Sequence, residues 1–181
     1  MSTWQTIWNT LAEDFSDIPD LAQGTRITVR LTLAAVLGGV IGYERETKGK
    51  AAGLRTHMLV ALGSALFVVV VQQSGGNSDS VSRVIQGLIA GIGFLGAGAI
   101  LNNRRDPHIR GLTTAAGVWM TAAIGVAAGV GRELTAILAT LLAIVILAIV
   151  PRFERWLVPD VSPPRPKHPP VQSPTETRGP E

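Results

Sequence analysis

Residues 84–103 read Val-Ile-Gln-Gly-Leu-Ile-Ala-Gly-Ile-Gly-Phe-Leu-Gly-Ala-Gly-Ala-Ile-Leu-Asn-Asn and carry no charged side chain over twenty positions. An uncharged, mostly apolar run of about eighteen residues or more is typical of a helix that crosses a membrane. Further charge-free runs occupy residues 56–78, 111–131 and 134–151. A shorter run, 31–43, reaches a spanning length when it is extended back to Ile27, and this extension includes Arg30.

We therefore expect an all-α, polytopic membrane protein, a bundle of five helices at about residues 27–43, 56–73, 84–101, 112–130 and 134–150. The composition agrees, because only 16% of the residues are charged, against about 25% in soluble domains. The chain has no cysteine, which excludes disulfides, thiolate metal sites and a cysteine nucleophile. A net charge of +3 does not indicate a nucleic-acid partner.

The basic residues predict the orientation of the bundle. Twelve of the 16 lysines and arginines lie in the loops 44–55 and 104–110 or beyond residue 151. The other four lie on the opposite side, namely Arg26, Arg30, Arg83 and Arg132. Basic loops stay in the cytoplasm, so we expect the N-terminus outside and the C-terminus inside (N-out/C-in).

The two ends of the chain differ from the membrane domain, which we place at residues 21–158. In residues 1–20, Trp4, Ile7, Trp8 and Leu11 recur at helical spacing, which predicts an amphipathic helix in the membrane interface. Residues 159–181 are rich in proline and poor in apolar side chains. Such a segment cannot bury enough surface to fold, so we expect a disordered cytoplasmic tail.

Glycine is concentrated in the third expected helix. Gly91-Ile-Gly-Phe-Leu-Gly96 matches a dinucleotide-binding fingerprint, but no acidic residue follows at the required distance. Small residues instead allow helices in lipid to approach closely. We expect this helix at the centre of the bundle and the fifth helix against lipid. The predicted packing positions are Gly38, Gly42, Gly87, Gly91, Gly93, Gly96, Gly98, Gly125 and Gly129.

Polar residues gather at the cytoplasmic ends of the helices. Two interpretations of them stay open: Glu44 and Arg55 form an ion pair that joins the first two helices, or Glu44, Glu46 and Asp106 offer oxygen ligands to a hydrated Mg²⁺. We expect no catalytic residue and no bound cofactor other than that ion. Lys48 is interpreted as a solvated loop residue. The candidate functional cluster is Glu44, Arg45, Glu46, Arg55, His57, Arg83, Asp106, Arg110, Thr113 and Thr114.

Four motifs together resemble the MgtC/SapB family of bacterial inner-membrane proteins. They are Gly42-Tyr-Glu-Arg-Glu46, Ala52-Gly-Leu-Arg-Thr-His57, Gly91-Ile-Gly-Phe-Leu-Gly-Ala-Gly98 and Arg110-Gly-Leu-Thr-Thr-Ala-Ala116. The short Pro-rich tail is similar to the SapB-type branch, which lacks the folded cytoplasmic C-terminal domain of the virulence-type members. The resemblance implies an inner-membrane location and a role in adaptation to low magnesium.

The resemblance also implies partners within the membrane. Well-known members of the family look like regulators that bind other membrane proteins, including the F-type ATP synthase, and a homo-oligomer is a further arrangement to consider. Two hypotheses follow. The first is a non-enzymatic regulator of magnesium homeostasis, and the alternative is a Mg²⁺ transporter or channel subunit. The absence of Asp and Glu from the middle of the expected spans favours the first.

Overall fold

The structure is a computed structural model that describes residues 2–14, 16, 20–101 and 111–157. The described residues form six helices, α1 (Thr3–Asp14), α2 (Leu21–Thr47), α3 (Leu54–Gln73), α4 (Ser78–Leu101), α5 (Leu112–Val130) and α6 (Glu133–Leu157). Helices α2 to α6 are long and apolar enough to cross a membrane. The expected all-α membrane bundle with five spanning helices is therefore confirmed. The N-out/C-in orientation stays a prediction.

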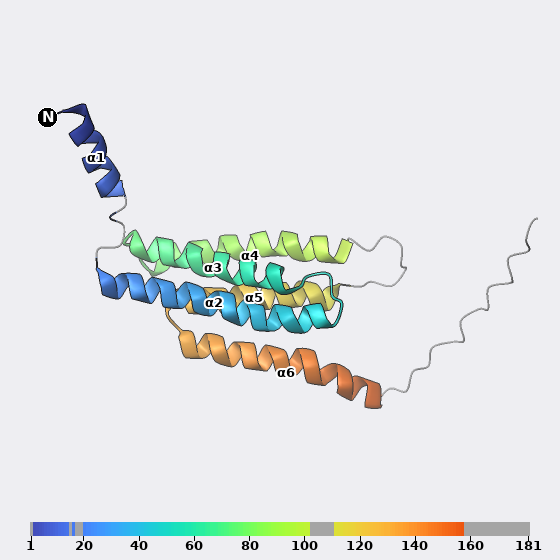
Figure 1. Cartoon of the computed structure of the whole chain (residues 1–181). Coiled ribbons are helices and arrows are strands. Elements are labelled where there is room, and N and C mark those ends of the chain that lie inside the picture. Colours follow the sequence, from blue (N-terminus) through green and yellow to red (C-terminus); the bar gives the residue numbers. More distant parts are fainter. Residues whose placement is uncertain (1, 15, 17–19, 102–110, 158–181) are drawn as a thin grey trace, which may run out of the picture.

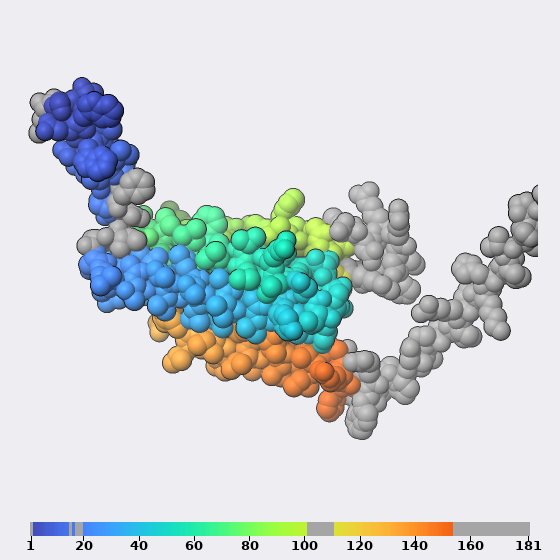
Figure 2. All heavy atoms as spheres, in the orientation of Figure 1, coloured from blue at the N-terminus to red at the C-terminus, as the bar shows by residue number. Residues whose placement is uncertain are grey.

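The five spanning helices run side by side and alternate in direction (Figure 1). One end of the bundle therefore holds the C-termini of α2, α4 and α6 with the N-termini of α3 and α5; we call it the carboxyl end of α2. The other end holds the start of α2, the end of α3 and the α5–α6 turn. Helix α1 stands apart and contacts none of the other described helices. Figure 2 shows α2, α3 and α6 together covering one face of the bundle.

Local sequence explains where the helices begin and end. The side chain of Asp20 accepts a hydrogen bond from the backbone N–H of Gln23 at 2.6 Å, so it caps α2 six residues before the expected start. The 27 residues of α2 extend about 40 Å at 1.5 Å per residue. This length exceeds the roughly 30 Å of a bilayer's hydrocarbon core, so polar residues at the ends of α2 can lie outside the core. Gly131, with φ of 90°, ends α5.

Helix α5, rather than α4, is the central helix, so the expectation for the third span is wrong. Helix α5 contacts α2, α3, α4 and α6, and 50% of its spanning window is buried, against 6% for α4. Helix α4 lies at the side of the bundle on α5 and α3. Helix α6 packs on α5 and α2 and exposes many leucine and isoleucine side chains, as expected of a lipid-facing helix.

The glycines explain this arrangement. A Cβ at Gly38 or Gly42 of α2 would lie within 3.0 Å of backbone atoms of His57 or Leu54 at the start of α3. From α5, Gly125 and Gly129 press in the same way on the backbone of Ala61 and Ala65. Helix α3 thus packs closely on two G-x-x-x-G faces, one from α2 and one from α5, and these two helices also contact each other.

The glycines of α4 do not pack in this way within the described bundle. No atom lies within 4 Å of a Cβ built at Gly87, Gly91, Gly93 or Gly98, and a Cβ at Gly96 makes only an ordinary contact with Ala115, at 3.5 Å. Glycine content therefore did not reveal which helix is central, because it does not say which way the small residues face.

Candidate functional site

The polar cluster lies at the carboxyl end of α2, and its first part is a pair of ionic contacts that Glu44 makes with Arg45 and Lys48. Arg45 donates from Nε to Glu44 Oε2 at 2.5 Å, and Lys48 Nζ lies 2.9 Å from Glu44 Oε1. The side chains of Arg45 and Glu44 are only 2% and 13% exposed. A charged group buried to this degree needs a partner of opposite charge, and each of the two provides it for the other.

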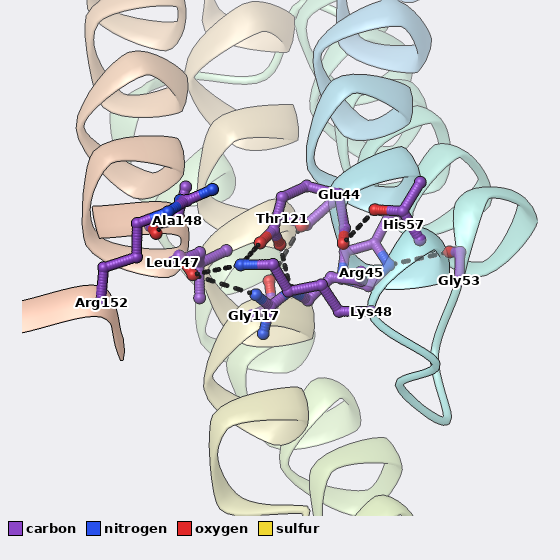
Figure 3. A network of polar contacts seen from close by, with 11 residues as sticks. Glu44, Arg45, Lys48, Gly53, His57, Gly117, Thr121, Leu147, Ala148 and Arg152 are labelled. Atoms are coloured by element: carbon purple, nitrogen blue, oxygen red, sulfur yellow. Dashed lines mark hydrogen bonds and ion pairs between the residues drawn. The ribbon is translucent and has the colours of Figure 1, made fainter. Parts of the chain in front are cut away.

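The same two cations reach across to α6, as Figure 3 shows. Arg45 Nη2 and Lys48 Nζ each donate to the backbone carbonyl of Leu147, at 3.4 Å. This carbonyl lies four residues before Pro151, which is inside α6. Proline has no N–H, so it cannot complete the helical hydrogen bond to the carbonyl at i−4. Arg45 and Lys48 therefore satisfy an acceptor that the sequence of α6 leaves open.

The start of α3 contributes a buried imidazole. His57 is fully buried, and its Nδ1 lies 2.9 Å from the carbonyl oxygen of Gly53. Because a carbonyl can only accept, Nδ1 carries a proton. Within the described residues, Nε2 has no hydrogen-bond partner. Nε2 faces α5, where a Cβ at Gly117 would be 3.6 Å away. The carbonyl of Gly117 accepts a hydrogen bond from the hydroxyl of Thr121 at 2.9 Å.

Glu46 has a separate, structural position. Its Oε2 accepts a hydrogen bond from the backbone N–H of Leu54 at 2.7 Å, where α3 begins. Gly53, the residue before α3, has no side chain to cap the helix. The carboxylate of Glu46, from α2, caps α3 instead. It also places a negative charge at the positive end of the α3 dipole. A Cβ at Gly53 would come within 2.6 Å of the same carboxylate oxygen.

The structure brings together only some of the residues predicted from the sequence. Glu44, Arg45 and His57 lie in the cluster, and Glu46 lies beside it at the start of α3. Thr114 is buried and Thr113 is exposed in the first turn of α5. Arg83 is exposed near the start of α4, at the opposite end of the bundle. Asp106 and Arg110 lie outside the described residues.

Two interpretations of these residues need correction. The ion pairs of Glu44 in the described structure are to Arg45 and Lys48, while Arg55 is exposed. The connection between α2 and α3 is instead the hydrogen bond from Leu54 to Glu46. Lys48 is not a free loop residue, because it contacts both Glu44 and Leu147. Pro151, at the end of the charge-free run 134–151, was the signal for this contact, since it marks the open carbonyl.

The described carboxylates do not fit a Mg²⁺ site. Glu44 is neutralised by two adjacent cations, and a divalent cation beside them would meet their repulsion. The bound oxygen of Glu46 is occupied by a backbone N–H. Among the described residues, no group of three or more His, Asp or Glu side chains is arranged to hold a metal ion.

Comparisons with known proteins agree with the motifs. The chain is 43% identical to the protein SrpB of Synechococcus elongatus over 144 residues, covering 72% of this chain and 79% of SrpB. It is 42% identical to the putative magnesium transporter YhiD of Escherichia coli K12, covering 67% of this chain and 59% of YhiD. It is 45% identical to the protein MgtC of Brucella abortus, covering 65% and 48%.

The chain thus spans about three fifths of the length of YhiD and about half that of the Brucella protein. No solved structure matches the chain. The model of the MgtC family matches residues 31–156. This range contains the polar cluster, all of α3, α4 and α5, α2 without its first ten residues and α6 without its last residue. The chain is a multi-pass membrane protein, and it belongs to the MgtC family.

Proposed function

We propose that this protein acts in magnesium homeostasis in the bacterial inner membrane, as a non-enzymatic regulator that works through contacts with other membrane proteins. The observation that carries this proposal is that the carboxylates at the carboxyl end of α2 are already bound by protein groups. Glu44 is held by Arg45 and Lys48, and Glu46 by the start of α3. The cluster joins helices to one another and is not an open set of oxygen ligands.

The spans support the same reading. The acidic residues of the described helices α2 to α6 lie near helix ends, at Glu44, Glu46, Asp79, Glu133 and Glu154. Mg²⁺ loses its water reluctantly, and an ion in the membrane interior needs compensating polar groups along its path. Family resemblance adds the F-type ATP synthase as a partner to test and leaves a homo-oligomer open.

The alternative function, a Mg²⁺ transporter or channel subunit, is favoured by one observation. The relative YhiD carries the name putative magnesium transporter. The matched region covers 59% of YhiD.

One pair of measurements separates the two functions. A deletion strain should grow poorly at low external magnesium and recover with the intact gene. Proteoliposomes of the pure protein should show no Mg²⁺ uptake above empty vesicles under an imposed potential. Saturable uptake by the pure protein would make the transporter reading correct.

Arg55 offers a sharper test of regulation by contact. It is exposed in the first turn of α3, so Arg55→Ala should fold and reach the membrane while losing a charge that a partner can bind. Rescue at low magnesium should fall with Arg55→Ala and persist with the control Lys50→Ala, which changes another exposed cation at the same end. Full rescue by both variants would speak against a contact through Arg55.

A further inference from the structure

A second polar site lies at the opposite end of the bundle, between the start of α2 and the end of α3. It is a pocket of about 180 Å³ whose polar lining comes from five side chains, Gln23, Arg26, Arg30, Gln72 and Gln73. Ile27 and Val69 complete the lining. Pockets for drug-sized ligands have volumes of about 300–1,000 Å³, so this one suits a small group with several polar atoms.

One of the two arginines is already committed to the fold. Arg30 Nη1 donates to Gln72 Oε1 at 3.1 Å and to the carbonyl of Gly129 at 3.3 Å. Its Nε lies 3.6 Å from Glu133 Oε1 at the start of α6. Glu133 balances the charge of Arg30, and these contacts hold the inner wall of the pocket in place.

The other arginine is uncommitted. Arg26 lies one helical turn before Arg30, on the same side of α2, and it is exposed. Within the described part of the chain, its side chain makes no hydrogen bond or ion pair, and the same is true of the amide groups of Gln23 and Gln73. Gln72 accepts from Arg30 through its oxygen, which leaves its NH₂ group as a donor.

We propose that this pocket binds the phosphate group of an anion at the surface of the membrane. A guanidinium with free N–H groups matches phosphate oxygens in geometry and charge, and the glutamine amides add neutral donors around it. Two sources offer this chemistry: the headgroup of an anionic phospholipid and free phosphate.

The depth of the pocket favours the phospholipid. Arg30 contacts Gly129 and Glu133, the residues on either side of the α5–α6 turn, and this turn lies at the end of the bundle. Arg26 lies four residues earlier, about 6 Å farther out along α2. The polar layer of a bilayer is roughly 5–8 Å thick on each side of the hydrocarbon core, so a phospholipid can bring its phosphate to Arg26 without leaving its own layer. Basic pockets between spanning helices bind lipid headgroups in this way.

The first test uses the full chain in mild detergent, with phosphatidylglycerol and phosphatidylcholine offered together and retention measured by native mass spectrometry. The wild type should retain phosphatidylglycerol in preference, because phosphatidylcholine carries a compensating cation. Arg26→Gln should bind phosphatidylglycerol about tenfold more weakly, the value of one charge-assisted hydrogen bond. The control Arg132→Gln removes the same charge from an exposed residue at the same end, outside the pocket, and should bind as the wild type does.

A second measurement separates the sources. If sodium phosphate raises the melting temperature of the wild type but not of Arg26→Gln, relative to sodium chloride at equal ionic strength, free phosphate also occupies the site. If phosphatidylglycerol raises the melting temperature of the wild type and sodium phosphate does not, the ligand is the lipid headgroup. Gln73→Leu, which removes an amide without changing the charge, should weaken retention by less than Arg26→Gln. Equal retention by Arg26→Gln and Arg132→Gln, or no preference for phosphatidylglycerol, would overturn the proposal.

Discussion

Arg45 in α2 donates a hydrogen bond to the carbonyl of Leu147 in α6, and this carbonyl is the acceptor that Pro151 leaves open. Two features that are individually unfavourable, a buried arginine and a proline inside a helix, therefore compensate each other. The contact attaches α6, a peripheral helix, to the carboxyl end of α2. Lys48 contacts the same carbonyl, so the attachment has one buried donor and one partly exposed donor.

Replacement of Arg45 by methionine should destabilise the protein strongly. The change leaves the carboxylate of Glu44 without its buried partner, and breaking such a pair costs roughly 3–5 kcal/mol. We expect a large drop in the melting temperature in detergent. Lys48→Met serves as the control, because the Lys48 side chain is 36% exposed and water can replace part of its contact. An equal drop in melting temperature for both variants would contradict the prediction that Arg45 contributes more to stability than Lys48.

The contribution of the Leu147 carbonyl can be measured separately with Pro151→Ala, which restores an N–H that can bond to it. An unsatisfied buried carbonyl costs about 1–3 kcal/mol. Arg45→Met should therefore cost less in the Pro151→Ala background than in the wild type, and a double-mutant cycle reports the difference. Strict additivity of the two changes would show that the arginine and the proline are not coupled.

The hydrogen bond between Glu46 and the start of α3 should contribute about 1 kcal/mol, as helix caps do. Glu46→Ala removes the cap, and Gly53→Ala places a methyl group 2.6 Å from the carboxylate oxygen. Since both changes act on one contact, the double variant should be little worse than the worse single variant. Thermal unfolding of the three variants checks this, and full additivity would mean that they act independently.

The sequence allowed the fold class to be predicted because a bilayer imposes a length on every span. Charge-free runs such as residues 84–103 are therefore visible without any knowledge of packing. The position of α4 could not be predicted in the same way. Its glycines are numerous, but packing depends on the face they occupy, and the glycines that matter, Gly38 and Gly125, lie on other helices and meet the backbone of α3.

The candidate site was predicted in part for a similar reason. Glu44 borders the run 31–43 and His57 lies in the run 56–78, which pointed to both, but Arg55 borders the second run as well and is exposed. Lys48 looked like a loop residue because its acceptor, the Leu147 carbonyl, is 99 residues away in the chain and is a backbone atom. Pro151 indicates that such an acceptor exists, but only the arrangement of α2 against α6 shows which side chains reach it.

A pair of glycine substitutions tests the corrected packing. A Cβ at Gly125 would overlap the carbonyl of Ala61, whereas a Cβ at Gly91 has open space around it. Overpacking of a close contact costs roughly 1–3 kcal/mol, so Gly125→Ala should lower the melting temperature clearly and Gly91→Ala should leave it nearly unchanged. The measurement is thermal stability of the two purified variants in the same detergent. A loss at Gly91 as large as at Gly125 would show that the open face of α4 has a partner outside the described bundle.

The orientation of the bundle can be tested with single cysteines, because the chain contains none. Ser78, at the start of α4, and Lys50, between α2 and α3, are both exposed and lie at opposite ends of the bundle. The excess of basic residues on the Lys50 side predicts that this side is cytoplasmic. An impermeant thiol reagent applied to intact cells should therefore label Ser78→Cys and not Lys50→Cys, while both should react after the membrane is made permeable. Labelling of Lys50→Cys alone in intact cells would show that the topology is the reverse of the predicted one. The Arg26 pocket would then lie in the cytoplasmic leaflet and the Glu44 cluster in the outer one.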